Sequence, residues 1–244
     1  MAKTILTDVR LFAVGADLTG NSNKVELSGE FEEKDTTNYG SAGWKEVLAG
    51  LGSAEINGEG QWEAGDATKV DDASWAQLGG LGPWTVCPTA ATVGALAYLT
   101  RALRCSYTFL GEVGEVAPWQ AKATSHWPLV RGQIAHPPGT ARTATGTGTA
   151  LQLGAVAAGQ RMYAGLHVLS AAGTTPSITC RVESDDNAGF SSPTTRLTFA
   201  AATAPSGEPL RTDGTAITDN YWRAAWTISG TSPSFMFALS LGIR

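Results

Sequence analysis

Apolar and polar residues alternate along two stretches between Lys24 and Trp62, which predicts two β-strands there. Successive side chains of a strand point to opposite faces, so each strand has one apolar and one largely acidic face. The apolar positions are Val25, Leu27, Phe31, Ile56 and Trp62. The acidic positions are Glu26, Glu30 and Glu32 in the first strand and Glu55 and Glu59 in the second. A sheet of these strands would pack on one side and present carboxylates on the other.

A short helix is predicted between the two strands, over residues 43–50. Trp44, Val47 and Leu48 have the spacing that places side chains on one face of a helix. Ser41 precedes them as a candidate N-cap, because its hydroxyl can accept a hydrogen bond from a free N–H of the first turn. The predicted order is therefore strand, short helix, strand.

The rest of the N-terminal half reads mostly as strands. Strands are predicted at residues 5–14, 84–87, 116–125 and 129–136, the last two paired as a hairpin. Residues 94–109 are rich in strand-forming residues, but their apolar spacing also fits a helix. A polar, Gly-rich connection spans residues 65–82 and contains a candidate short helix at residues 70–78.

The order of parts around residues 24–62 resembles a known family. A strand, the segment at residues 36–41, a Gly-Trp helix and a strand that ends at Trp62 resemble the major tail protein (tail tube protein) of long-tailed, siphovirus-type bacteriophages. The resemblance covers about residues 1–135 and rests on the order of elements. It implies a β-barrel or β-sandwich with a short helix, and it favours a strand at residues 94–109.

A Pro/Gly/Thr-rich stretch after His136 marks a domain boundary, because prolines donate no ladder hydrogen bond and the stretch has no apolar face. The predicted fold class is mainly β. We expect a tail-tube-type β-domain at residues 1–142, a linker at 143–149 and an accessory β-sandwich or jelly-roll-like domain at 150–244. The strands predicted for this last domain are residues 151–156, 161–170, 177–183, 195–199, 221–229 and 234–241.

Composition narrows the class of protein. The 244 residues are 43% hydrophobic and 16% charged, so the chain can bury a core. The net charge is −5 and the basic residues are scattered, which argues against a protein that grips nucleic acid. Three widely separated cysteines suggest free thiols in a reducing compartment. No secretory pattern or membrane-spanning run is present, so we expect no membrane partner and assembly in the host cytoplasm.

The sequence offers little catalytic chemistry. The three histidines lie in different segments without metal-ligand spacing, and no nucleophile elbow is present. We therefore expect a non-enzyme without a cofactor. Asp185, Asp186 and Asn187 offer the oxygen ligands that calcium uses, but such clusters are more often turns that end a strand. They form the only metal candidate, and the turn is the favoured interpretation.

An alternative function rests on aromatic residues of the C-terminal half. Tyr221, Trp222 and Trp226 would stack on sugars if they were exposed together, as in a β-adhesin or a carbohydrate-binding module. Core packing is the favoured interpretation of such bulky side chains.

The resemblance implies a structural virion protein, the tail tube subunit. Six copies would close a ring, and rings would stack around the tape-measure protein, below a tail-terminator protein, into a conduit through which DNA passes without specific binding. Long loops of this family reach the next ring, which gives residues 65–82 that role. The candidate ring-stacking residues are Asp66, Lys69, Asp71, Asp72 and Trp75. The five glutamates of the two strands would line the lumen, and their charge would repel DNA phosphates. The C-terminal domain would lie outside the tube.

Overall fold

The chain folds mainly as antiparallel β-structure, and the computed structural model describes residues 5–66 and 69–244. The strands before residue 137 are β1 (Arg10–Ala13), β2 (Ala16–Asp17), β3 (Ser22–Asp35), β4 (Val47–Gln61), β5 (Leu81–Cys87), β6 (Leu96–Phe109), β7 (Pro118–Ser125) and β8 (Val130–His136). The later strands are β9 (Gly146–Thr147), β10 (Leu151–Gln152), β11 (Met162–Asp185), β12 (Thr194–Thr198), β13 (Ser206–Arg211) and β14 (Tyr221–Ile243). The described residues also form one α-helix, α1 (Val70–Gln77), and two 3-10 turns, η1 (Thr19–Asn21) and η2 (Tyr39–Ser41).

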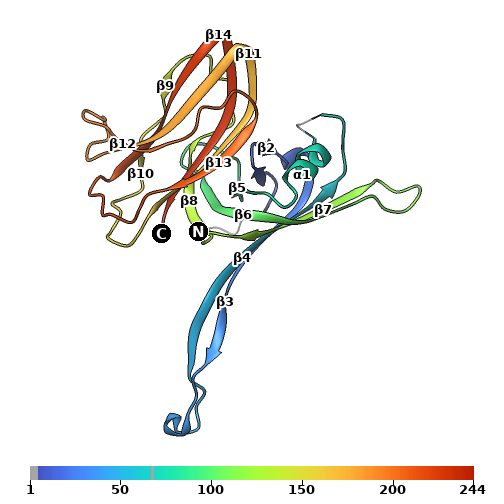
Figure 1. Cartoon of the computed structure of the whole chain (residues 1–244), viewed down its shortest axis with the longest axis vertical. Helices are drawn as coiled ribbons and strands as arrows, with labels where there is room; N and C mark the ends of the chain where they lie inside the picture. The colour runs from blue at the N-terminus through green and yellow to red at the C-terminus, as the bar shows by residue number, and fades with distance from the viewer. Residues whose placement is uncertain (1–4, 67–68) are drawn as a thin grey trace.

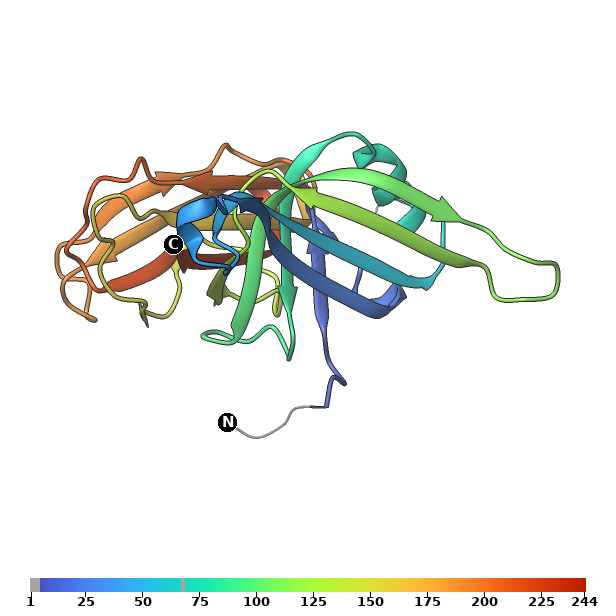
Figure 2. The same ribbon diagram turned by 90° about the horizontal axis from the view of Figure 1, so that it is seen from below.

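Figure 1 shows two β-lobes and a long two-stranded arm that projects away from both. The arm consists of β3 and β4, and η2 caps its tip. A second, smaller projection is the loop between β6 and β7, which extends from the far end of the N-terminal lobe in both views (Figures 1 and 2). Within the described part of the chain, no helix has the length and hydrophobicity needed to cross a bilayer.

The N-terminal lobe is organised around β6. One edge of β6 pairs with β5, and the other edge pairs first with β8 and then with β7. β7 continues to β4, and β4 to β3. On the other side, β5 pairs with β1. The apolar faces of these strands enclose a core that includes Leu11, Ile56, Trp84 and Trp119. Gly58 makes this packing possible, because a Cβ there would lie 2.9 Å from the Trp119 ring.

The C-terminal lobe is a folded ribbon of two long strands. β11 and β14 pair from Met162↔Ile243 to Asp185↔Tyr221, and the register shifts near their midpoints. The ribbon bends there, where Gly173 and Gly230 have φ values of 113° and 119° that favour glycine. The two halves of the ribbon pack face to face over one apolar cluster. A β-sandwich therefore forms from a single hairpin, with β10, β12 and β13 along its edges.

The two lobes share hydrogen bonds. β8 pairs with β14 through His136↔Leu239 and Gln133↔Leu241. A Cβ at Gly132 would lie 2.0 Å from the Leu241 carbonyl oxygen, so the strands approach closely here. The stretch predicted as a linker also contacts the C-terminal lobe, since β9 pairs with β14. The proposed division at residues 143–149 therefore has a continuous sheet across it.

Several expectations from the sequence need correction. The helix expected at residues 43–50 is absent, because residues 47–49 already pair with residues 33–35 in the arm. β7 and β8 form as strands but do not pair with each other, because they lie one after the other along the same edge of β6. Phe31 does not pack and is 61% exposed. β13 was not expected, and the short helix expected at residues 70–78 forms as α1.

The strand interpretation of residues 94–109 is confirmed by β6. The mainly β fold class, with one short α-helix and a large antiparallel sheet, is confirmed as well.

Candidate assembly surfaces

The arm exposes apolar side chains that the monomer does not cover. Trp44 is 80% exposed and Leu51 is 82% exposed, and Phe31 and Leu48 are exposed as well. Several charged residues of the arm, in contrast, have partners within it. Lys34 pairs with Glu32, Lys45 pairs with Glu33, and the Asp35 carboxylate accepts the Thr37 N–H at 2.8 Å. The arm thus leaves large apolar side chains uncovered in the monomer.

One edge of β3 is also unsatisfied. β3 is 14 residues long and pairs with β4 along one edge. Its other edge pairs with no strand among the described residues. A long open edge presents a row of free N–H and C=O groups and readily pairs with another strand. The arm thus combines an open edge with exposed apolar side chains.

The predicted acidic face is real but mixed in charge. The antiparallel register places Glu26 and Glu30 of β3 beside Asn57 and Ser53 of β4, on the face that carries Glu55 and Glu59. Two lysines lie among them. Lys24 lies 3.0 Å from Glu26 and 3.3 Å from Glu59, and Lys122 lies 2.6 Å from Glu55. The face is thus a network of four carboxylates and two ammonium groups, with carboxylates in excess.

The position of Glu32 and the presence of Lys122 on this face could not be predicted from the sequence. The β3–β4 register shifts between Phe31 and Glu33, so Glu32 lies at an interruption of the ladder, and it pairs with Lys34. Lys122 comes from β7, which sequence reasoning did not connect with β4. The alternation of Gln120, Lys122 and Thr124 with apolar neighbours predicts a polar face for this strand. It does not predict which strand lies beside it.

The segment expected to stack rings is largely anchored in its own chain, and its residues 67 and 68 lie outside the described residues. Val70 and Ala73 of α1 are buried in the core of the N-terminal lobe. The Asp71 carboxylate accepts hydrogen bonds from Trp62 Nε1 at 3.0 Å and from the Tyr107 hydroxyl at 2.8 Å. The segment predicted as a polar, Gly-rich connection is therefore fixed to the core through α1.

The other candidate ring-stacking residues differ in what they present to solvent. Lys69 pairs with Glu63, and Asp72 accepts the Gly65 N–H at 2.9 Å. Asp66 has an interaction of its own within the chain. Trp75 is 65% exposed and touches Phe109 edge to face, with 6.5 Å between ring centroids. Trp75 is the candidate that offers a large free surface.

The remaining sequence candidates have structural roles. The Asp185 carboxylate accepts the N–H groups of Asn187 and Ser192, which lowers its pKa and closes the turn after β11. Its neighbour Asp186 has a raised pKa because the two carboxyls share a hydrogen bond. No group of three or more His, Cys, Asp or Glu within residues 5–66 and 69–244 is placed to hold a metal ion. Trp222 and Trp226 are buried in the C-terminal core, so they form no sugar-stacking platform.

Two histidines hold the lobes together, and both are buried. His167 Nδ1 accepts the Gly15 N–H at 3.4 Å, and its Nε2 lies 3.0 Å from the Thr85 hydroxyl, which in turn contacts Ser240. This chain of hydrogen bonds joins both lobes. Complete burial lowers the pKa of His167 to about 3, because no counter-charge compensates for lost hydration.

His136 forms a comparable contact at the end of β8. Its Nε2 accepts a hydrogen bond from Arg142 Nε at 3.0 Å, so Nδ1 carries the proton and donates it to the Phe237 carbonyl oxygen. Burial, together with the nearby Arg142 charge, lowers its pKa to about 4. The imidazole stacks on the Phe237 ring with 3.9 Å between centroids. His136 is therefore a neutral residue that packs between β8 and β14.

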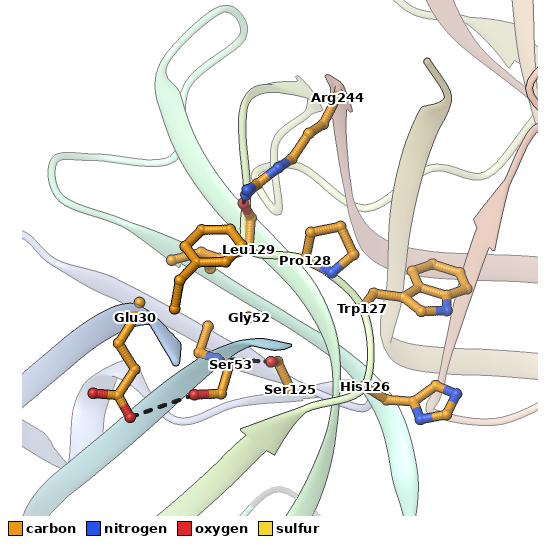
Figure 3. A pocket seen from close by; sticks show the side chains of 12 residues that line it. Glu30, Gly52, Ser53, Ser125, His126, Trp127, Pro128, Leu129 and Arg244 are labelled. Carbon is orange, nitrogen blue, oxygen red and sulfur yellow. Dashed lines mark hydrogen bonds between the residues drawn. The ribbon is translucent and has the colours of Figure 1, made fainter. Parts of the chain in front are cut away.

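A groove lies where the arm meets the body. Figure 3 shows its residues: Glu30 and Ser53 come from the arm, Ser125 to Leu129 connect β7 with β8, and Arg244 ends the chain. The Ser125 hydroxyl accepts the Ala54 N–H at 2.9 Å, which fixes the connection against the arm. The groove has a volume of about 510 Å³ and opens to solvent.

Comparison with known proteins gives structural similarities only. No protein-family model matches this sequence, and no curated protein matches it. A chain of the virion of a native gene transfer agent (GTA) particle is 20% identical with a TM-score of 0.40, covering 50% of this chain and 93% of that one. A chain of the tail of an empty GTA particle with C6 symmetry is 22% identical with a TM-score of 0.40, covering 50% and 91%. The SPP1 Dit protein, described as a hub of the adsorption apparatus, is 9% identical with a TM-score of 0.38, covering 98% and 100%.

Proposed function

We propose that this chain is a structural subunit of the tail of a phage-like particle, and that it is the tail tube subunit. Copies would form rings of six, and rings would stack into a tube around a tape-measure protein. The resemblance of residues 24–62 to the tail tube family motivates this proposal. The observation that carries it is the arm, with its open 14-residue edge and its exposed apolar side chains.

Burial of the exposed apolar side chains and pairing of the open strand edge would stabilise an assembly relative to the monomer. Burying an apolar side chain of the size of Leu or Phe stabilises an assembly by roughly 1.5–3 kcal/mol. Trp44, Leu48 and Leu51 are exposed in the monomer, and an open strand edge is an aggregation hazard unless a specific partner covers it. In a ring where each arm contacts the next subunit, the apolar side chains are buried and the strand edge is covered in every copy.

Under this proposal the mixed face of β3, β4 and β7 lines the bore. Its excess of carboxylates over lysines would keep DNA phosphates from binding, and the ion pairs would hold the side chains close to the wall. The C-terminal lobe would lie outside the tube.

Negative-stain microscopy of the purified full chain tests the proposal. Tubes of indefinite length support a tube subunit. Single rings that never stack would overturn the tube role in favour of a hub, and dispersed monomers at high concentration would overturn both.

A variant in which residues 32–51 are replaced by Asn-Gly keeps the buried part of the ladder and should not assemble. Trp44→Ser combined with Leu51→Ser keeps the arm length and should also weaken assembly.

The matched control for the apolar variants is Lys34→Gln combined with Glu32→Gln. It removes one internal ion pair of the arm without changing its apolar surface. Exposed ion pairs contribute only about 0–1 kcal/mol, so this control should assemble as the natural chain does.

A further inference from the structure

We propose that the acidic loop between β6 and β7 of one copy docks into the arginine- and tryptophan-lined groove of a second copy. The contact rests on the proposed self-assembly and names the surfaces that form it. Below, the β6–β7 loop means residues 110–117, and the arginine groove means the groove at the base of the arm together with Arg101 and Arg211 beside its Trp127.

The arginine groove presents cations without counter-ions. Arg101 and Arg211 flank the Trp127 ring, with guanidinium carbons 5.8 Å and 4.9 Å from its centroid. Arg244 lines the same groove and donates to the Leu129 carbonyl oxygen. Ten ion pairs occur among the described residues, and none includes these three arginines. In a chain with net charge −5, such a site is suited to a partner that brings carboxylates.

The walls of the arginine groove are apolar enough to receive aliphatic side chains. Phe31, Pro128 and Leu129 line it, and Trp127 packs edge to face on Tyr163 with 5.6 Å between ring centroids. The carboxylate among its lining residues is Glu30, which lies on the arm side and accepts a hydrogen bond from Ser53. Figure 3 places Glu30 and Trp127 at opposite ends of the groove. An acidic occupant would therefore bind toward the Trp127 end.

The β6–β7 loop carries the complementary groups. Its two carboxylates, Glu112 and Glu115, are exposed and form no ion pair within the described chain. Between and beside them, Val113 is fully exposed, and Val116 and Leu110 are mostly exposed. Three exposed aliphatic side chains in one short loop, with two carboxylates among them, form an apolar patch with a polar rim, and such patches mark interaction surfaces.

A chain cannot fill its own arginine groove with its own β6–β7 loop. Arg101 and the start of the loop are separated by eight residues of β6, which is about 26 Å of extended strand. Figures 1 and 2 show the loop pointing away from the body, beyond the end of the sheet. The contact must therefore join two different surfaces of two copies, and such head-to-tail contacts generate rings or filaments.

The arm is a poorer occupant of the arginine groove. The two lysines near its tip pair with Glu32 and Glu33, and Asp35 accepts the Thr37 N–H, so Glu46 is the one exposed carboxylate near the described tip of the arm without an ion pair or such a bond. The β6–β7 loop brings two free carboxylates with aliphatic neighbours. Charge complementarity thus selects the loop, and it predicts faster association and tighter binding at low salt.

Charge reversal tests the contact in the full chain. The loop variant carries Glu112→Arg and Glu115→Arg, and the groove variant carries Arg101→Glu and Arg211→Glu. Each should weaken self-association at low ionic strength by about tenfold or more, measured by analytical ultracentrifugation. Mixing the two variants should restore association, because the intact loop of the groove variant meets the intact groove of the loop variant, and the reversed loop and the reversed groove are complementary to each other as well. Thermal unfolding of each variant checks that the lobes remain folded.

Matched controls reverse the same charges elsewhere. Asp186→Arg lies in the β11–β12 turn and Arg131→Glu lies on β8, and both side chains are exposed. Both should associate as the natural chain does, which separates a specific contact from a change in net charge. Arg211→Gln removes one cation with less perturbation than reversal and should show a smaller loss.

The outcomes separate this contact from the proposed function. If the natural chain forms tubes or rings and both reversal variants do so equally well, the contact is overturned and the structural role stands. If the natural chain forms only open chains that both variants abolish, the contact stands and the closed tube fails. If the natural chain stays monomeric at all concentrations and salt conditions, both are overturned.

Discussion

The guanidinium carbon of Arg104 lies 4.7 Å from the centroid of the Trp84 ring, inside the N-terminal lobe. Arg104 is only 1% exposed, and none of its three nitrogen atoms has a hydrogen-bond partner among the described residues. Trp84 Nε1 and the hydroxyl of Ser74, a residue of α1, are also buried without a hydrogen-bond partner among the described residues. Burial lowers the pKa of Arg104 to about 10 because a buried cation loses hydration. The contact with the Trp84 ring offsets only part of that cost.

Replacing Arg104 by Met should therefore stabilise the folded chain. Methionine fills a similar volume without a charge, and replacing buried charged groups by well-packed apolar ones is often neutral or stabilising by about 1–4 kcal/mol. Urea denaturation of the full chain measures the free energy of unfolding. Arg104→Lys keeps the charge and should show no such gain. A large loss of stability in Arg104→Met would mean that the guanidinium has a stabilising partner after all.

Acid should destabilise the chain through His136 and His167. Both folded-state pKa values, about 4 and about 3, lie below the ordinary value near 6.5. The unfolded chain therefore binds these protons first, and the free energy of unfolding falls as the pH drops below about 6.5. Linkage gives a loss on the order of 2 kcal/mol per histidine between pH 7 and pH 5. Urea denaturation at several pH values measures it, and His167→Gln should reduce the slope. An unchanged slope in that variant would contradict the assignment.

The strands of the arm were predictable because period-two alternation is a local signal. The helix prediction at residues 43–50 was wrong, although Trp44, Val47 and Leu48 have helical spacing. No apolar partner covers that face, and the pairing of residues 47–49 with 33–35 continues the arm instead. Ala42 and Gly43 have φ values of 50° and 85°, which a helix does not allow. The outcome depended on contacts outside the segment.

Strand partners were not predictable from the sequence. Residues 116–125 and 129–136 look like a hairpin, but each pairs with β6 instead, one after the other along the same edge. The same applies to Lys122, whose ion pair with Glu55 depends on β7 lying beside β4. Alternation indicates which residues share a face of one strand. It does not indicate which strand comes next in the sheet.

Trp75 should matter for ring stacking without mattering for folding. It is the exposed aromatic residue of α1, while Val70 and Ala73 of the same helix are buried. Trp75→Ala should leave thermal unfolding nearly unchanged, since it loses mainly the contact with Phe109, and it should shorten or abolish tubes in negative-stain images. Val70→Ala, the matched internal change, should lower stability by about 1–3 kcal/mol through the cavity it leaves. Normal tubes from Trp75→Ala would remove α1 from the stacking contact.

A fragment that ends at Arg142 should fail to fold, although a boundary near that residue was expected from the sequence. The fragment lacks β14, which pairs with β8 and stacks Phe237 on His136. Its loss would leave the edge of β8 open and His136 uncovered, and we expect an insoluble or aggregating product. Soluble expression and circular dichroism measure this. A soluble, two-state fragment would support an independent N-terminal domain despite the shared sheet.

Cys105 should report whether the mixed face of β3, β4 and β7 lines a lumen. Its side chain is exposed, and the sulfur lies 3.4 Å from the Thr124 hydroxyl on that face. Cys87 and Cys180 are buried, and burial raises the pKa of each thiol to about 12. A thiol reagent should therefore modify one cysteine per native monomer and three after denaturation, because the thiolate is the reactive form.

In assembled tubes, a small reagent should still reach Cys105 through the bore, while a bulky polyethylene-glycol maleimide should react only near the tube ends. The control variant carries Asp186→Cys and Cys105→Ser, which moves the thiol to the exposed turn of the C-terminal lobe. The bulky reagent should label this variant equally well in monomers and tubes, because that lobe is proposed to lie outside. Rapid labelling of Cys105 by the bulky reagent along whole tubes would place the mixed face on the outer surface. The glutamates of that face would then play no part in DNA passage.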